Sequence, residues 1–143
     1  MTKGSLSSYI VVASAAAIVS GAITSYVRTS EAQPAPAPPA QLLTQPMADL
    51  PGREVRISLL DRAPQASSPP HRHPGHHTFG YVLEGTYEFA VDGGSSRTLK
   101  AGEVFYEPPG ALHSVSRNPS PDQRTKILVF MVADQKKPST VAE

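Results

Sequence analysis

The 143-residue sequence contains no cysteine and no tryptophan, and its charges are almost balanced, with 13 Lys and Arg against 12 Asp and Glu. Without cysteine the chain forms no disulfide, binds no metal through a thiolate and carries no lipid on an N-terminal cysteine. Any metal must therefore be held by nitrogen and oxygen ligands. Lys3, Arg28 and Glu31 lie within the first 32 residues, so the rest of the chain is formally neutral. A neutral domain has no electrostatic footprint for nucleic acid, which we exclude as a partner.

An uncharged run rich in Ala, Ser, Val and Ile follows Lys3 and continues to Val27. A basic start followed by an apolar run is the layout of a secretory signal, and the small residues Ser30 and Ala32 suit a cleavage site. A run of about 20 apolar residues is also long enough to span a bilayer, so an uncleaved membrane anchor is the alternative. Residues 1–32 therefore predict export, either to the periplasm or the medium, or to the periplasmic face of the inner membrane.

Proline dominates residues 33–46, where it removes backbone donors and favours an extended spacer over helix or sheet. We interpret residues 33–52 as a linker, 53–134 as the folded domain and 135–143 as a C-terminal tail. The length suits one domain with a real core and is too short for two.

The domain has the pattern of short β-strands, and no amphipathic helix is expected after residue 47. Strands are predicted at residues 54–61, 78–84, 86–92, 97–100, 103–107, 113–116 and 125–133. Short strands at this spacing predict an all-β barrel or jelly-roll sandwich. The segment 125–133 is apolar at nearly every position, which indicates burial on both faces and predicts a homodimer.

All five histidines fall in two short runs, at 71–77 and at 113. His71 and His73 are two residues apart, so on a strand both imidazoles point to the same face. His113 follows Pro108-Pro109-Gly110, a rigid turn that would begin another strand. Three imidazoles from neighbouring strands can converge on one ion and leave positions open for water or substrate, as in reactive metal sites.

These two runs resemble the two motifs of the cupin superfamily, over about residues 53–133. In the first motif His71-Arg72-His73 matches and Gly85 closes it. In the second motif the matches are Gly102, Pro108, Gly110 and His113, and Asn118 comes one residue late. The resemblance implies a double-stranded β-helix, also called a jelly-roll barrel, with a metal held by His71, His73 and His113.

The sequence departs from the family pattern where the family has a glutamate ligand. Counting back from Gly85 places Thr78 there, a poor ligand, whereas counting forward from His73 places His77 there. A β-bulge after His77 would reconcile the two counts. We therefore predict His77 as the fourth ligand, with His76 or no fourth ligand as alternatives; otherwise His76 is expected to be solvated.

Other candidate residues lie close to these motifs. Glu84 and Glu107 are interpreted as surface charges at strand ends, although Glu107 could orient a ligand histidine. Four aromatic residues are expected in the core: Tyr81, Tyr87, Phe105 and Tyr106.

A site of histidines alone would keep the full charge of a divalent ion and attract anionic substrates. Its donors suit a divalent transition metal, namely Fe, Mn, Ni, Cu or Zn. We predict a metal-dependent oxidoreductase of the dioxygenase type that acts on a small organic molecule. The alternatives are a non-enzymatic module that binds a small molecule or a metal, a site that has lost its metal, and a hydrolase or sugar isomerase.

Overall fold

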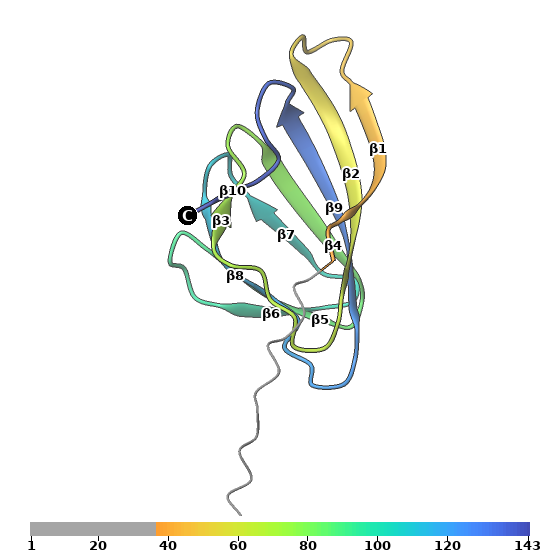
Figure 1. Ribbon diagram of the computed structural model, residues 1–143, viewed down its shortest axis with the longest axis vertical. Helices are drawn as coiled ribbons and strands as arrows, with labels where there is room; N and C mark the ends of the chain where they lie inside the picture. The colour runs from red at the N-terminus through yellow and green to blue at the C-terminus, as the bar shows by residue number, and fades with distance from the viewer. Residues whose placement is uncertain (1–36) are drawn as a thin grey trace, which may run out of the picture. The chain divides into compact units, whose positions relative to one another are not determined.

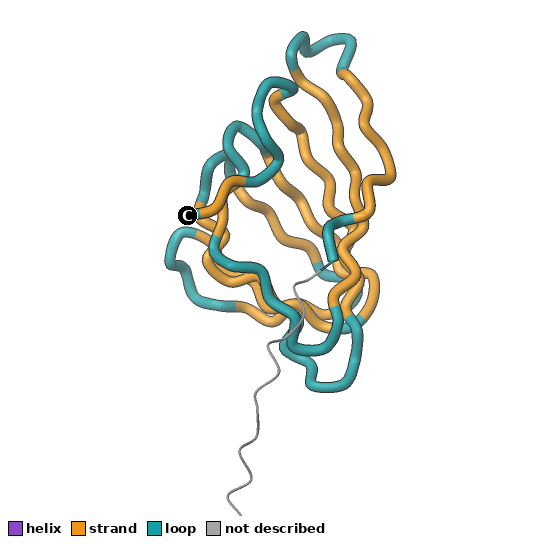
Figure 2. Tube along the Cα trace, in the orientation of Figure 1, coloured by secondary structure: helices purple, strands orange, loops and turns teal. Residues whose placement is uncertain are grey.

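The computed structural model describes residues 37–143, which form two five-stranded antiparallel sheets and no helix (Figures 1 and 2). The strands are β1 (Ala40–Pro46), β2 (Arg53–Arg62), β3 (His71–Arg72), β4 (His77–Glu84), β5 (Thr86–Val91), β6 (Arg97–Lys100), β7 (Val104–Glu107), β8 (Leu112–Arg117), β9 (Thr125–Asp134) and β10 (Val141–Ala142). One sheet has the order β1-β2-β9-β4-β7 and the other β10-β3-β8-β5-β6. The predicted all-β jelly-roll architecture is confirmed. The predicted signal or anchor, residues 1–32, lies outside the described residues, and residues 37–143 contain no helix that could cross a bilayer.

Strand β9 is central to the first sheet, between β2 and β4. Its residues alternate strictly between the two faces: Ile127, Val129 and Met131 are buried, while the residues between them are half-buried. The apolar run is therefore fully buried on its inner face only. The homodimer that this run suggested stays a prediction.

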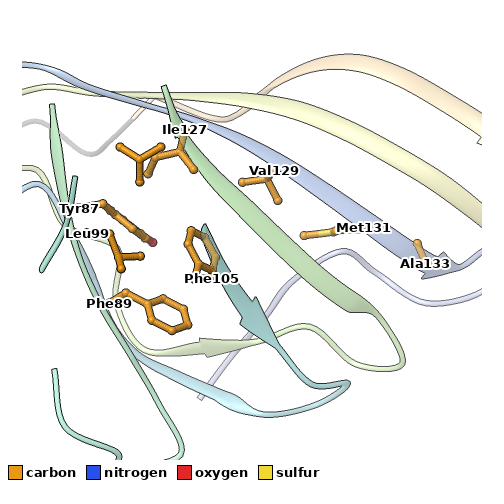
Figure 3. Close-up of a cluster of buried hydrophobic side chains, with 9 residues drawn as sticks. Tyr87, Phe89, Leu99, Phe105, Ile127, Val129, Met131 and Ala133 are labelled. Carbon is orange, nitrogen blue, oxygen red and sulfur yellow. The ribbon is translucent and has the colours of Figure 1, made fainter. Parts of the chain in front are cut away.

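The hydrophobic core fills the space between the sheets, where Tyr87, Phe89 and Phe105 lie together under β9 (Figure 3). Tyr87 and Phe105 are buried as predicted. Tyr81 and Tyr106 are exposed, which corrects their assignment to the core. The physical reason is strand parity, since Tyr106 is the neighbour of buried Phe105 and must point to the opposite face.

Two segments outside the predicted domain also form strands. Residues Ala40–Pro46 pair antiparallel with β2 as an exposed edge strand, which corrects the expectation that residues 33–46 form no sheet. Residues 40–46 contain a single proline, Pro46, and an edge strand tolerates proline at its end. The C-terminal tail likewise contributes β10, which pairs with β3.

Candidate metal centre

Three histidines meet on the neighbouring strands β3 and β8 of the second sheet and just beyond the end of β3. His71 on β3 and His113 on β8 are directly opposite each other in the ladder, and His73 follows β3. One nitrogen from each of the three rings lies within 4.8 Å of the others. The structure thus brings together the three histidines that the motifs single out.

Two Pro-Gly turns fix this arrangement. The His76 N–H donates to the His73 carbonyl at 3.2 Å across Pro74-Gly75, where Gly75 has φ 77°. The second turn has the same form, with Gly110 at φ 77° after Pro109. A proline followed by a residue of positive φ is typical of a type II turn. The two turns are joined, because the Gly110 N–H donates to the His73 carbonyl at 3.0 Å.

Hydrogen bonds to backbone carbonyls set the proton positions of two of these imidazoles. His71 donates from Nδ1 to the Pro69 carbonyl at 2.8 Å. His73 donates from Nδ1 to the Ser139 carbonyl at 2.5 Å. Because a carbonyl only accepts, Nδ1 carries the proton and Nε2 keeps its lone pair for a metal. Burial lowers the pKa of His71, which favours the neutral ligand form.

In His113 it is Nε2 that has a hydrogen-bond partner. Its Nε2 lies 3.4 Å from the Tyr87 hydroxyl, which in turn lies 2.7 Å from the Ser116 hydroxyl. Burial raises the pKa of the Tyr87 phenol, so this hydroxyl stays protonated. His113 Nδ1 is buried and has no hydrogen-bond partner among the described residues. This nitrogen is therefore the one left for a ligand.

Glu107, at the end of β7, lies inside the site, which corrects its interpretation as a surface charge. Its side chain is 2 % exposed. One carboxylate oxygen, Oε2, is 3.2 Å from His113 Nδ1 and 3.7 Å from His73 Nε2. The sequence carried a signal for this position, because Glu107 follows the core residue Phe105 by two and so shares its inward face.

The structure does not bring His77 to the three histidines. His77 Nδ1 lies 2.8 Å from the Tyr106 hydroxyl, and the two rings stack. Thr78 points the other way and is buried against the cavity. No bulge separates His77 from Thr78 in the pairing of β4 with β9, so the register that would carry His77 inward is not formed.

His76 is fully buried, which corrects the expectation that it is solvated. Its Nε2–H donates to the Pro138 carbonyl at 2.8 Å, and its Nδ1 accepts the Asp134 N–H at 3.0 Å. Burial lowers its pKa, so the ring is neutral. Both nitrogens are occupied, and His76 serves to hold the tail rather than to offer a ligand atom.

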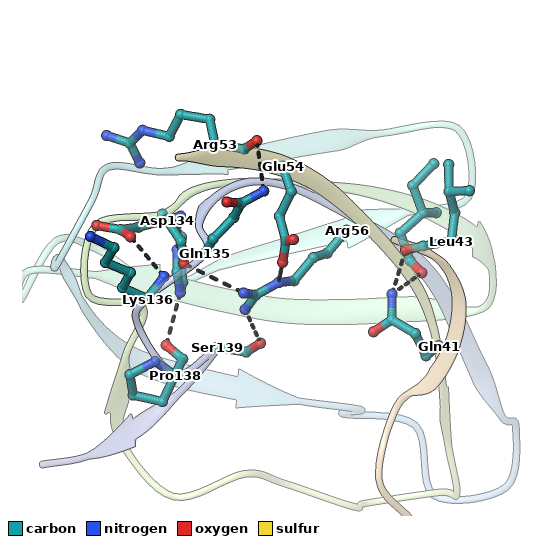
Figure 4. A network of polar contacts seen from close by, with 12 residues as sticks. Gln41, Leu43, Arg53, Glu54, Arg56, Asp134, Gln135, Lys136, Pro138 and Ser139 are labelled. Carbon is teal, nitrogen blue, oxygen red and sulfur yellow. Dashed lines mark hydrogen bonds and ion pairs between the residues drawn. The ribbon is translucent and has the colours of Figure 1, made fainter. Parts of the chain in front are cut away.

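The C-terminal tail packs beside the candidate centre through several independent contacts. Arg56 on β2 donates to the Ser139 hydroxyl at 2.8 Å and lies close to Glu54 and the Asp134 carbonyl (Figure 4). Arg72 forms an exposed ion pair with Glu143. The contacts of the tail with the two histidines, His73 and His76, use the backbone carbonyls of Ser139 and Pro138, which any residue would provide, so the composition of residues 135–143 does not indicate them.

The histidines and Glu107 line a cavity of about 470 Å³ between the sheets. Arg62, at the end of β2, lines the same cavity and is 7 % exposed. It donates from Nη2 to the Ser68 hydroxyl at 2.6 Å, whereas its Nε has no partner among the described residues. No Asp or Glu of residues 37–143 forms an ion pair with it. Sequence reasoning missed Arg62, since an arginine at the end of a strand reads as a surface charge.

The sequence profile described as the cupin domain matches residues 58–131. Among curated proteins, germin-like protein subfamily 2 member 2 of Arabidopsis thaliana is 38% identical over 68 residues, which cover 45% of this chain and 31% of that protein. Germin-like protein 5-1 of Oryza sativa subsp. japonica is 37% identical with the same coverage. The chain therefore spans about a third of the length of these relatives.

Solved structures resemble the barrel as well. An oxalate oxidase in complex with the substrate analogue glycolate has a TM-score of 0.54 and 28% identity, over 61% of this chain and 45% of that one. An uncharacterized conserved protein with a double-stranded β-helix domain from Klebsiella pneumoniae has a TM-score of 0.59 and 22% identity, over 79% and 89% of the two chains. At 22% identity, the similarity to the Klebsiella pneumoniae protein shows the fold alone.

Proposed function

This chain belongs to the cupin family, and we propose that it is a metal-binding member in which His71, His73 and His113 hold a divalent transition metal for the oxidation of a small organic acid. The observation that carries the proposal is the convergence of three imidazole nitrogens within 4.8 Å in the lining of one cavity. Nitrogen donors of this kind suit iron, manganese, nickel, copper or zinc. When bound, such an ion supplies Lewis-acid chemistry, and iron or manganese supplies redox chemistry as well.

The protonation of the imidazoles fits a metal. His71 and His73 have their Nδ1 protons committed to carbonyls, so both present an unprotonated Nε2. The partners that fix them, Pro69 and Ser139, are backbone groups that hold each ring in one orientation. Such outer partners are a regular feature of functional metal sites. A site of solvated histidines would not need them.

Arg62 supports an anionic substrate. A guanidinium is costly to bury without a counter-ion, and none is found among the described residues around Arg62. Its unpartnered Nε and its place in the cavity wall suit a carboxylate, which arginine binds in a fork of two hydrogen bonds. The similarity to an oxalate oxidase that holds glycolate supports the same chemical class.

The metal part of the proposal is tested by measuring the metal content of the purified full chain by elemental analysis. The wild type is expected to bind one ion per chain, and His71→Ala and His113→Ala are expected to lose it. His77→Ala is the matched control, because His77 is a histidine of the same run that faces away from the cluster. Metal lost from His77→Ala as well, or absent from the wild type, would overturn the assignment.

The reaction is tested by oxygen uptake of the protein loaded with Fe(II) or Mn(II), with short hydroxy acids and dicarboxylates as substrates. Oxygen consumption with at least one acid is expected, and Arg62→Gln should raise its KM by about tenfold or more, since a hydrogen bond to a charged group is lost. Tight binding of an acid without any oxygen consumption would instead support a non-enzymatic binding module. Export of the protein, and any membrane anchor, remain predictions from residues 1–32.

A further inference from the structure

The candidate centre contains a buried carboxylate, that of Glu107, at a different position in the sequence from the glutamate of the family motif. The family position for a glutamate ligand is occupied by Thr78, on β4. In the sheet, Thr78 is directly opposite Glu107 on β7. The two side chains therefore leave neighbouring strands at the same level and on the same face of the sheet. A carboxylate placed on either strand reaches the same end of the cavity.

We infer that Glu107 is the carboxylate ligand of this metal centre, in place of the glutamate that the family carries at the position of Thr78. The inference rests on the proposed metal-binding function and adds a fourth protein ligand to its three histidines. It also replaces the expectation that His77 completes the set.

The distances around Glu107 are those of neighbouring ligands. Its Oε2 lies 3.2 Å from His113 Nδ1 and 3.7 Å from His73 Nε2. Two atoms bound to one metal at about 2.0–2.2 Å lie roughly 3 Å apart. Oε2 and His113 Nδ1 are both buried, yet neither has a hydrogen-bond partner among the described residues, and they do not bond to each other in spite of their separation. A metal ion bound to both atoms would satisfy them at this separation.

The position of Glu107 distinguishes a ligand from a residue that only orients a histidine. An orienting carboxylate accepts the proton of the imidazole nitrogen that does not bind the metal. In His73 that nitrogen is Nδ1, and it already donates to the Ser139 carbonyl. Glu107 lies beside the other nitrogen, Nε2, which is the ligand atom. The carboxylate is therefore on the metal side of the ring.

A carboxylate ligand changes the charge of the centre. With three neutral imidazoles and one carboxylate, a divalent ion keeps a net charge of +1 instead of +2. The centre then resembles the family pattern in its donor set, although the carboxylate comes from the neighbouring strand. Buried Thr78 has no hydrogen-bond partner for its hydroxyl among the described residues, so its position is polar and open to the cavity.

The test uses the full chain and three variants: Glu107→Gln, Thr78→Glu combined with Glu107→Gln, and Glu84→Gln. Glu107→Gln keeps the shape and removes the charge, and the double variant returns a carboxylate to the position of Thr78. Glu84→Gln is the control, since Glu84 is an exposed carboxylate paired with Lys126. Affinity for Mn(II) is measured by competition with a chelator, and the ligand field by the visible spectrum of the Co(II)-loaded protein. Circular dichroism verifies folding.

Glu107→Gln is expected to weaken Mn(II) binding by at least about 100-fold. Loss of a residue that only hydrogen-bonds to a ligand costs about 10–100-fold, so the larger effect indicates a direct ligand. It is also expected to change the Co(II) spectrum. The double variant should recover most of the affinity, and Glu84→Gln should match the wild type. Mn(II) affinity of Glu107→Gln within about threefold of the wild type, with an unchanged Co(II) spectrum, would overturn the inference and leave the three histidines. If Glu107→Gln fails to fold, the test depends on the double variant. Weak Mn(II) binding by a folded double variant also contradicts the inference. A wild type that binds neither metal would instead contradict the proposed function.

Discussion

Removing residues 138–143 should destabilise the barrel and loosen the metal centre together. The deletion removes the Pro138 carbonyl that accepts from buried His76 and the Ser139 carbonyl that accepts from His73. Both acceptors are backbone atoms, so no point substitution removes them, and truncation is the direct test. The Arg72–Glu143 ion pair also disappears, but both groups are exposed and screened by solvent, so this pair contributes little.

The two hydrogen bonds set the minimum size of the effect. Each is worth about 0.5–1.5 kcal/mol, so the truncation should cost at least about 1–3 kcal/mol. The deletion also removes the pairing of β10 with β3 and the hydrogen bond from Arg56 to Ser139. A domain of this size loses about 4–8 °C in melting temperature for each kcal/mol. His73 also loses the partner that fixes its ring, and such losses lower metal affinity by about 10–100-fold.

Thermal melts followed by circular dichroism, and Mn(II) affinity by chelator competition, measure the two effects. Glu143→Gln is the matched control, because it removes only the exposed ion pair and should leave both quantities near the wild type. If the truncated chain melts with the wild type and binds Mn(II) equally well, the tail does not support the centre. Equal losses in Glu143→Gln would show that the surface ion pair, not the buried hydrogen bonds, carries the effect.

Three further predictions concern the barrel around the site. Burial lowers the pKa of His76, so the unfolded chain takes up this proton more readily, and the stability of the metal-free protein should be full above about pH 6.5 and fall below it. Melting temperatures across pH 5–8 test this, and His76→Gln should reduce the pH dependence and leave the part that comes from His71, whose pKa burial also lowers. The side-chain amide of buried Asn118 donates to the carbonyls of Ala63 and Gln123, with the Arg62 carbonyl also within 3.3 Å. Asn118→Asp should therefore lower the free energy of unfolding by about 2–4 kcal/mol in urea titrations, and a loss below about 0.5 kcal/mol would contradict this role. A Cβ on Gly80 would lie 2.0 Å from the Phe105 ring, so Gly80→Ala should lower the free energy of unfolding by about 1–3 kcal/mol in urea titrations. If this contact is the cause, the loss should be smaller in a Phe105→Ala background.

Much of the fold could be predicted from local patterns. Period-two alternation of apolar residues locates β2, because a strand with one face in the core must alternate, whereas β9 is located by its apolar run. The two Pro-Gly turns could be read as well, since they place His73 and His113 at strand ends through backbone conformations that these residues favour. The predictions for Tyr106 and Glu107 are wrong, although the same alternation applies to them. Because Phe105 points into the core, its neighbour Tyr106 must point outward and Glu107, two residues after Phe105, must point inward.

The sequence by itself determined the barrel and three of the proposed ligands, His71, His73 and His113, because strand parity and turn chemistry are local properties that a motif records. Only the tertiary structure places a carboxylate, that of Glu107, beside these histidines. Thr78 and Glu107 are 29 positions apart along the chain, and their adjacency depends on the register between β4 and β7. The roles of His76 and of the tail have the same origin, since they depend on backbone carbonyls brought close by the closing of the chain. Such contacts leave no pattern in the residues that make them.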